Sequence, residues 1–258
     1  MAELFAMWRS TRMVVLTAIS AALYAAVLIP FKVVPIIPGI TEFRPANAIV
    51  VVCALLFGPA GAWGAALGNL IGDFFGGLGP GDLFGFVANL AYGFVVYALW
   101  EAVTDAPPTS HTVGGAVGLL GVIALASLLC ATIVGWGLHT LGFHPFTVLA
   151  PIVFLNNAVA AGVLAPPLLR VLHPRIANAR LLYRDVLGPR PPRSRARRLA
   201  GVILVIAGTL GAFAAGLLVA SGHWHPPWAI VHTASRSADV GLGLVPILAI
   251  VLIGCILL

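Results

Sequence analysis

The chain has 258 residues, of which 60 % are hydrophobic and only 9 % are charged, and its mean hydropathy is +1.06. Soluble domains carry roughly 25 % charged residues, so this composition excludes an ordinary water-soluble fold. Several apolar runs approach the length of about 20 residues that crosses a bilayer as a helix. The runs are continuous and lack the alternating pattern of membrane barrel strands. The composition therefore predicts an all-α polytopic membrane protein.

The net charge of +6 is concentrated in one segment of the chain. Nine of the 14 Lys and Arg residues lie between Arg170 and Arg198. Cytoplasmic loops of membrane proteins are enriched in Lys and Arg, so we expect this segment to be cytoplasmic. The expected contact of these charges is membrane lipid, whose cytoplasmic face is anionic, and no nucleic-acid partner is predicted.

Apolar runs separated by glycine- and proline-rich turns predict eight membrane helices with both termini in the cytoplasm, because Arg9 and Arg12 precede the first helix. The expected ranges, in chain order, are Met13–Ile29, Ala46–Phe57, Ala60–Phe75, Leu83–Val103, Val113–Leu138, Phe146–Leu172, Leu199–Ala220 and Val240–Leu258. Pro30 is expected to end the first helix. The pattern divides the chain into a six-helix domain (1–172), a basic cytoplasmic linker (173–198) and an additional transmembrane helix pair (199–258).

The first loop, residues 30–45, contains four prolines and is largely apolar. Prolines stiffen it and prevent a continuous helix. We expect it to fold back over the outer mouth of the bundle as a lid. Its charged residues Glu42 and Arg44 either pair with each other or contact a charged ligand.

The stretch from Thr41 to Trp100 places its polar residues where the apolar runs end. Asn69 and Asp73 are four residues apart, so they share one face of a helix near its outer end. Ionisable groups at membrane depth are costly and often functional, although Asp73 could also face outer water. On the same helix, Gly64, Gly68 and Gly72 form a close-packing stripe.

Further polar and aromatic residues fall at the same predicted outer level. Asn89, Asn156 and Asn157 could orient a heterocyclic ligand, or they could bond between helices. Tyr92 could stack on a flat ring. His139 flanks the third outer loop. The candidate substrate-binding residues are therefore Glu42, Arg44, Asn69, Asp73, Asn89, Tyr92, His139, Asn156 and Asn157.

The sequence has no catalytic signature. It contains no Walker A motif, no G-x-S-x-G and no H-E-x-x-H. Cys53, Cys130 and Cys255 lie within apolar runs without metal or redox spacing. No catalytic residue, metal site or cofactor is predicted.

Small residues recur along the first helix. Ala18, Ala22 and Ala26 are four residues apart and form a smooth ridge, which allows another helix to approach closely. The ridge could pack inside the chain, or it could be the docking strip for a separate membrane subunit.

The order of these features resembles the S component of an energy-coupling factor (ECF) transporter. The alanine ridge after two arginines, the lid-like first loop, the short second helix and the LLFGPAGAWGAALGNLIGDFFGG hairpin carry the resemblance over residues 10–175. The resemblance implies a prokaryotic plasma-membrane subunit that captures a vitamin or similar micronutrient. Its implied partners are a transmembrane coupling subunit, docked through the alanine ridge, and two cytoplasmic ATPases. The helix pair at 199–258 departs from this family, whose members typically have six helices.

Two other functions stay open at this level. The first is a stand-alone secondary carrier or channel, although the sequence shows no clear inverted repeat and no chain of buried ionisable residues. The second is a lipid-modifying membrane enzyme, for which Asp73, Asp82, His139 and His144 form only a sparse cluster. Vitamins, corrins, haem-like rings, queuosine precursors and metal chelates all remain possible substrates of an S component.

Overall fold

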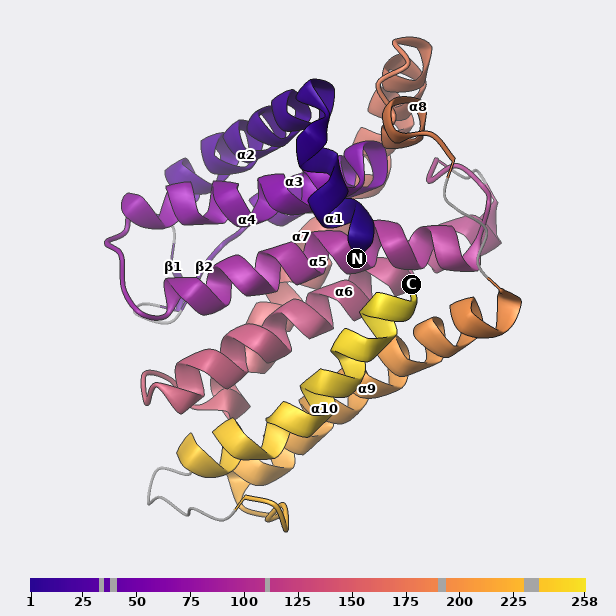
Figure 1. Cartoon of the computed structure of the whole chain (residues 1–258). Helices are drawn as coiled ribbons and strands as arrows, with labels where there is room; N and C mark the ends of the chain where they lie inside the picture. The colour runs from indigo at the N-terminus through magenta and orange to yellow at the C-terminus, as the bar shows by residue number, and fades with distance from the viewer. Residues whose placement is uncertain (33–34, 38–40, 110–111, 190–193, 230–236) are drawn as a thin grey trace.

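The computed structural model describes residues 1–32, 35–37, 41–109, 112–189, 194–229 and 237–258, with backbone alone for 35–37 and 41–42. The elements are α1 (Ala2–Ala6), η1 (Met7–Arg9), α2 (Thr11–Phe31), β1 (Pro35–Ile37), β2 (Thr41–Glu42), α3 (Ala46–Phe57), α4 (Pro59–Phe74), α5 (Asp82–Val103), α6 (Val113–Thr140), α7 (Phe146–Asn178), α8 (Tyr183–Leu187), α9 (Arg195–Ser221) and α10 (Ser237–Leu257). Figure 1 shows them as one helical bundle.

The predicted class of polytopic helical membrane protein is confirmed. Within the described residues, six helices are long and apolar enough to cross a membrane. The 12-residue helix α3 is shorter, about 18 Å at 1.5 Å per residue, against a hydrocarbon core of about 30 Å. It is almost entirely buried and packs against α2, α4, α5 and α7. Short α3 therefore belongs to the interior of the bundle.

Several helix ends differ from the sequence prediction by one to six residues, and two of these differences involve prolines. Helix α2 continues through Pro30 to Phe31, because a proline in the last turn removes only one late hydrogen bond. Helix α7 runs to Asn178, past the predicted end at Leu172, and includes Pro166 and Pro167. Membrane helices tolerate such prolines because neighbouring groups satisfy the freed backbone atoms. The first loop also differs: β1 and β2 pair as a small antiparallel sheet.

Both chain ends lie at the same end of the bundle, where α8 also lies (Figure 1). The sequence predicts this arrangement for an even number of membrane crossings. Assignment of this end to the cytoplasm still rests on its arginines. We call it the basic end, and the end that carries β1 and β2 the lid end.

The glycine stripe of α4 packs against α2. A Cβ atom added at Gly64 would lie 2.3 Å from the Cβ of Ser20, and one at Gly68 would lie 2.7 Å from the carbonyl oxygen of Ala21. Real Cβ atoms do not approach other atoms so closely, so only glycine permits this spacing of the two helices. The stripe therefore serves a contact within the chain.

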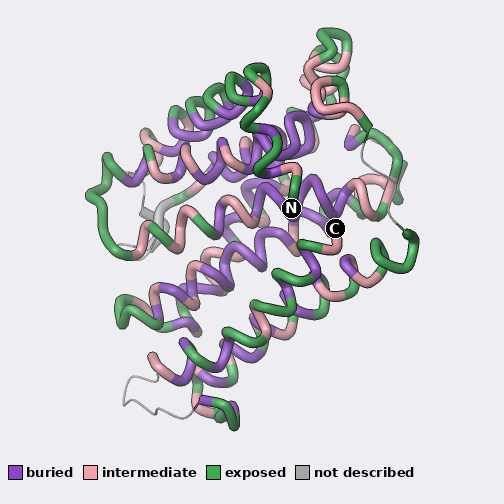
Figure 2. The backbone as a smooth tube through the Cα atoms, viewed as in Figure 1, coloured by how far each residue is buried: buried purple, intermediate pink, exposed green. Residues whose placement is uncertain are grey.

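The additional helix pair, α9 and α10, packs against α6 and α7. The Phe146 ring fills the space beside Gly216, and the indole nitrogen of Trp136 donates to the carbonyl oxygen of Gly241 at 3.0 Å. In Figure 1 this hairpin and α2 lie on opposite sides of the bundle. Figure 2 shows buried residues through the middle of the bundle and exposed residues along the outer face of α2.

Gly68→Ala is expected to destabilise the fold by about 1–3 kcal/mol, because the added methyl group overpacks the α2–α4 contact. Gly121→Ala is the matched control, since a Cβ there meets nothing within 4 Å. Thermal unfolding in mild detergent, followed by circular dichroism, measures both. An equal unfolding midpoint for the two variants would contradict the close-contact role of Gly68.

Candidate functional site

A buried polar cluster joins four helices in the half of the bundle nearer the lid end. Tyr24 of α2, Asn47 of α3, Asn89 of α5 and Asn157 of α7 are each at most 3 % exposed. The Tyr24 hydroxyl lies 3.5 Å from Oδ1 of Asn47 and 3.4 Å from Oδ1 of Asn89. Nδ2 of Asn47 donates to Oδ1 of Asn157 at 2.6 Å. We call these four residues the central cluster.

Helix α6 extends the central cluster with two further side chains. Nδ2 of Asn157 donates to Sγ of Cys130 at 3.5 Å. One turn earlier on α6, the Ser127 hydroxyl donates to the Tyr92 hydroxyl of α5 at 3.0 Å. Five helices thus contribute polar atoms to the interior. Each does so through a side chain that has a hydrogen-bond partner on a neighbouring helix.

A second polar group lies beside the central cluster. We call its ion pair, Lys32 and Asp73, the outer pair. Nζ of Lys32 lies 3.0 Å from Oδ1 of Asp73, and their side chains are 15 % and 10 % exposed. Nδ2 of Asn69 donates to the other oxygen of Asp73 at 2.6 Å. A charge removed from water needs such a partner, because the low dielectric interior penalises an unpaired ion.

Gly85 brings the two groups together. Its carbonyl oxygen accepts from Nδ2 of Asn89 at 2.8 Å. A Cβ atom added at Gly85 would lie 3.1 Å from Nδ2 of Asn69. The absence of a side chain on Gly85 therefore lets the outer pair and the central cluster approach each other.

Arg44, at the end of the first loop, faces the same region. Its backbone nitrogen donates to Oδ1 of Asn156 on α7 at 3.4 Å, and its Nε atom is buried. Its guanidinium charge interacts electrostatically with the Tyr24 hydroxyl and the Cys130 thiol. Arg44 thus brings positive charge to the side of the cluster that faces the loop. The side chain of Glu42, for which the sequence left open a pair with Arg44 or a ligand contact, lies outside the described residues.

The structure brings most of the predicted substrate-binding residues into this one region. They are Arg44, Asn69, Asp73, Asn89, Tyr92, Asn156 and Asn157. His139 has a local contact at the turn from α6 to α7, where its Nδ1 accepts from the backbone nitrogen of Phe146 at 3.2 Å. This hydrogen bond orders the turn and defines which ring nitrogen carries the proton, because Nδ1 acts as the acceptor.

Sequence reasoning missed Tyr24, Lys32, Asn47, Ser127 and Cys130 as members of the region. A signal was present for two of them, because Tyr24 and Asn47 interrupt apolar runs in their helices. Such polar interruptions of membrane helices face the protein interior. No such interruption marked Cys130 as a member of the region, because cysteine is common in apolar runs.

The predicted alanine docking residues lie on the outer face of α2. Ala18, Ala22 and Ala26 are exposed, whereas Ala21 and Ala25 are buried. The two sets of small residues therefore face in different directions, and α4 covers only the second set.

Comparison with known proteins identifies a family but no individual relative. The model of a family described as QueT transporter matches residues 14–174. This match begins in α2 and ends in α7, so it includes the central cluster, the outer pair and the alanine residues. No curated protein and no solved structure is significantly similar to the chain.

Lys32→Met is expected to lower the stability of the protein by about 3 kcal/mol, because it leaves the buried Asp73 carboxylate without its cation. The double variant Lys32→Met with Asp73→Asn is expected to recover most of this loss, since no unpaired charge remains. Chemical unfolding of the purified variants in detergent measures the difference. Equal stabilities of the single and double variants would show that the pair is not energetically coupled.

Proposed function

The chain belongs to the QueT transporter family of S components, the substrate-capture subunits of ECF transporters, and from this premise we propose that it binds a queuosine precursor at the central cluster. A member of this family is a transporter subunit and not an enzyme. Membership favours the micronutrient-capture hypothesis over a stand-alone carrier or a lipid-modifying enzyme.

The observation that carries the proposal is the convergence of hydrogen-bonding side chains from separate helices on one buried region. A queuosine precursor has a flat, guanine-like ring whose edges present donors and acceptors in one plane. Each asparagine carboxamide offers two donors and an acceptor in a plane, and Tyr24 adds a hydroxyl group. Ligand sites in proteins combine apolar walls with a few such convergent polar groups.

Binding in this region would require local rearrangement on the side of the first loop. The central cluster is almost fully buried, and its amides bond to one another. The contact between the Arg44 backbone and Asn156 lies on this side of the cluster. On our proposal, this contact opens for ligand entry, and the amides exchange their mutual hydrogen bonds for bonds to the ring.

We further propose that the exposed strip of Ala18, Ala22 and Ala26 docks onto a transmembrane coupling subunit, which acts with two cytoplasmic ATPases. Small side chains let two membrane helices approach closely and gain van der Waals contact. The α9–α10 hairpin does not obstruct this approach, because it packs on the opposite side of the bundle from α2. The proposed location is the plasma membrane of a prokaryote, with both termini in the cytoplasm.

Asn157→Leu is expected to weaken binding of a queuosine precursor at least tenfold, about the effect of losing one or two buried hydrogen bonds. Asn178→Leu is the matched control, because Asn178 is exposed at the end of α7. Equilibrium binding of a radiolabelled precursor to purified, folded protein, with guanine as competitor, measures the affinity. If the unaltered protein binds no precursor, the proposed substrate is wrong; if Asn157→Leu binds normally, the proposed site is wrong.

Ala22→Leu is expected to reduce co-purification with the coupling subunit and the ATPases about tenfold, because a larger side chain separates the two helices. Ala214→Leu is the matched control, since Ala214 is an exposed alanine on α9. Precursor binding by the isolated variants should stay unchanged, which separates docking from capture. Normal assembly of the Ala22→Leu variant would contradict the docking strip.

A further inference from the structure

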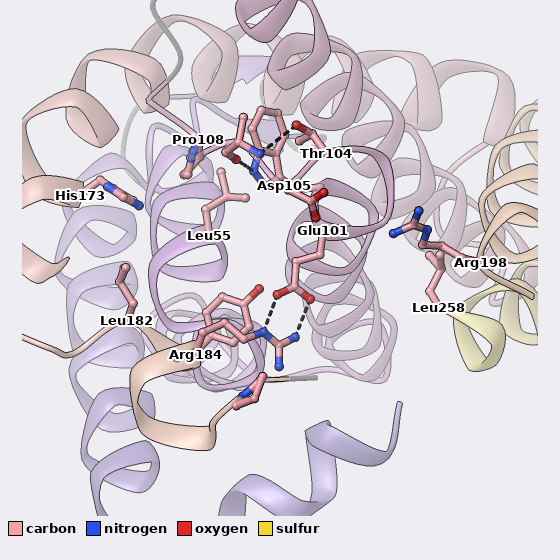
Figure 3. A pocket seen from close by; sticks show the side chains of 14 residues that line it. Leu55, Glu101, Thr104, Asp105, Pro108, His173, Leu182, Arg184, Arg198 and Leu258 are labelled. Carbon is pink, nitrogen blue, oxygen red and sulfur yellow. Dashed lines mark hydrogen bonds and ion pairs between the residues drawn. The ribbon is translucent and has the colours of Figure 1, made fainter. Parts of the chain in front are cut away.

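A chamber of about 610 Å³ opens at the basic end of the bundle, away from the central cluster. Its lining residues come from α3, α5 and the loop that follows it, α7, the α8 region, the start of α9 and the last residue of the chain. Figure 3 shows the interior of the chamber with charged side chains on several sides. The volume is within the range of about 300–1,000 Å³ that small-molecule sites occupy.

One wall of the chamber is an internally satisfied ion cluster. Arg184 of α8 donates through Nε and Nη2 to the two oxygens of Glu101, each at 2.5 Å. It also donates to Glu3 of α1 at 3.1 and 3.4 Å. The neighbouring ring of Tyr183 covers Gly58 at the turn between α3 and α4. The charge of Arg184 is therefore compensated within the protein, and this wall is a rigid boundary.

Three other polar side chains of the lining differ from this wall. Among the described residues, Asp105, Arg198 and His173 make no side-chain ion pair or hydrogen bond. In Figure 3, His173 and Arg198 lie on opposite sides of the chamber, with Asp105 and Glu101 between them. The chamber thus presents one available carboxylate together with available basic groups.

The position of the chamber indicates which kind of molecule can reach its charged side chains. It lies at the ends of the membrane helices, where lipid headgroups contact a membrane protein. Leu55, Leu182 and Leu258 add apolar surface to the same lining. An amphipathic ligand with both a negative and a positive group matches a lining that contains acidic, basic and apolar side chains.

We infer that the chamber binds the headgroup of a phosphatidylethanolamine-type phospholipid from the cytoplasmic leaflet. The lipid phosphate is held by Arg198, and its primary ammonium group donates to Asp105, which lies on the same side of His173 as Arg198 does. The leucines of the lining contact the glycerol region. Phosphatidylcholine lacks ammonium N–H donors, and phosphatidylglycerol lacks the positive charge, so neither satisfies Asp105. A lipid held here bridges the QueT-matched domain and α9, the first helix of the additional pair.

The test compares lipid retention by the full chain. Protein purified in mild detergent is incorporated into nanodiscs with equal parts of phosphatidylethanolamine, phosphatidylcholine and phosphatidylglycerol. Native mass spectrometry then identifies the lipid that stays bound to the protein after the protein is released from the nanodisc. The expected result is selective retention of phosphatidylethanolamine. Arg198→Gln should lower this retention about tenfold, the effect of one lost charge-assisted hydrogen bond. Asp105→Asn should abolish the preference over phosphatidylcholine.

Matched controls separate the chamber from the general charge of this end. Arg175→Gln and Asp185→Asn change exposed residues of the same types outside the chamber lining, and they should leave retention unchanged. Soluble phosphoethanolamine added at millimolar concentration should not displace the lipid if its apolar part contributes to binding. Equal retention of the three lipids, preference for phosphatidylglycerol, or equal losses in the control variants would overturn the inference. Unfolding midpoints of all four variants confirm that retention is compared between folded proteins.

Discussion

A polar side chain buried among membrane helices has no water to bond, so it must find its partner within the protein, and in the central cluster the side chains meet across helices. This constraint organises the interior of the protein. Tyr24 and Asn157 both reach Asn47, which lies at the start of the short helix α3. The resulting bonds hold α3 between α2 and α7, although α3 alone is too short to cross the hydrocarbon core. The same bonds place the polar atoms that are available for ligand recognition.

Helix α2 has two different faces of small residues, and each has its own consequence. The buried face, with Ala21 and Ala25, allows the glycines of α4 to approach to contact distance. The exposed face, with Ala18 and Ala22, is left open by every other described element. A helix that is fixed firmly on one side can present its other side to a partner, and here the exposed alanines lie beside the exposed side chains of Ile19 and Leu23. This arrangement supports docking without any change in the packing of the core.

The helices outside the QueT-matched region extend the bundle without obstructing either proposed site, the central cluster or the exposed alanine strip of α2. The α9–α10 hairpin packs on α6 and α7, and its contacts include Phe146 and Trp136. The connection from α7 to this hairpin passes through α8, which Arg184 anchors to the ends of α1 and α5. The chamber at the basic end is a product of this connection, because α8 and α9 provide two of its walls.

The sequence was sufficient for the class of protein, for the order of the eight predicted helices and for the shared face of Asn69 and Asp73 on α4; among the described residues, six helices are long and apolar enough to cross a membrane. These features are local: hydropathy and helical spacing can be read from neighbouring residues, and they place Asn69 and Asp73 on one face without knowledge of other helices. The exact ends of α2 and α7 were not predictable, because prolines in membrane helices end or continue a helix according to their surroundings.

Only the tertiary structure decided which polar residues meet. Lys32 pairs with Asp73 across 41 positions, and Asn47 bonds to Asn157 across 110. Such pairs depend on which helix faces turn toward each other, and that choice is made by the summed packing of side chains such as Gly64 and Gly68. A helical pattern shows that a residue faces the interior. It does not identify the helix that it meets there, because every apolar neighbour satisfies the pattern equally well.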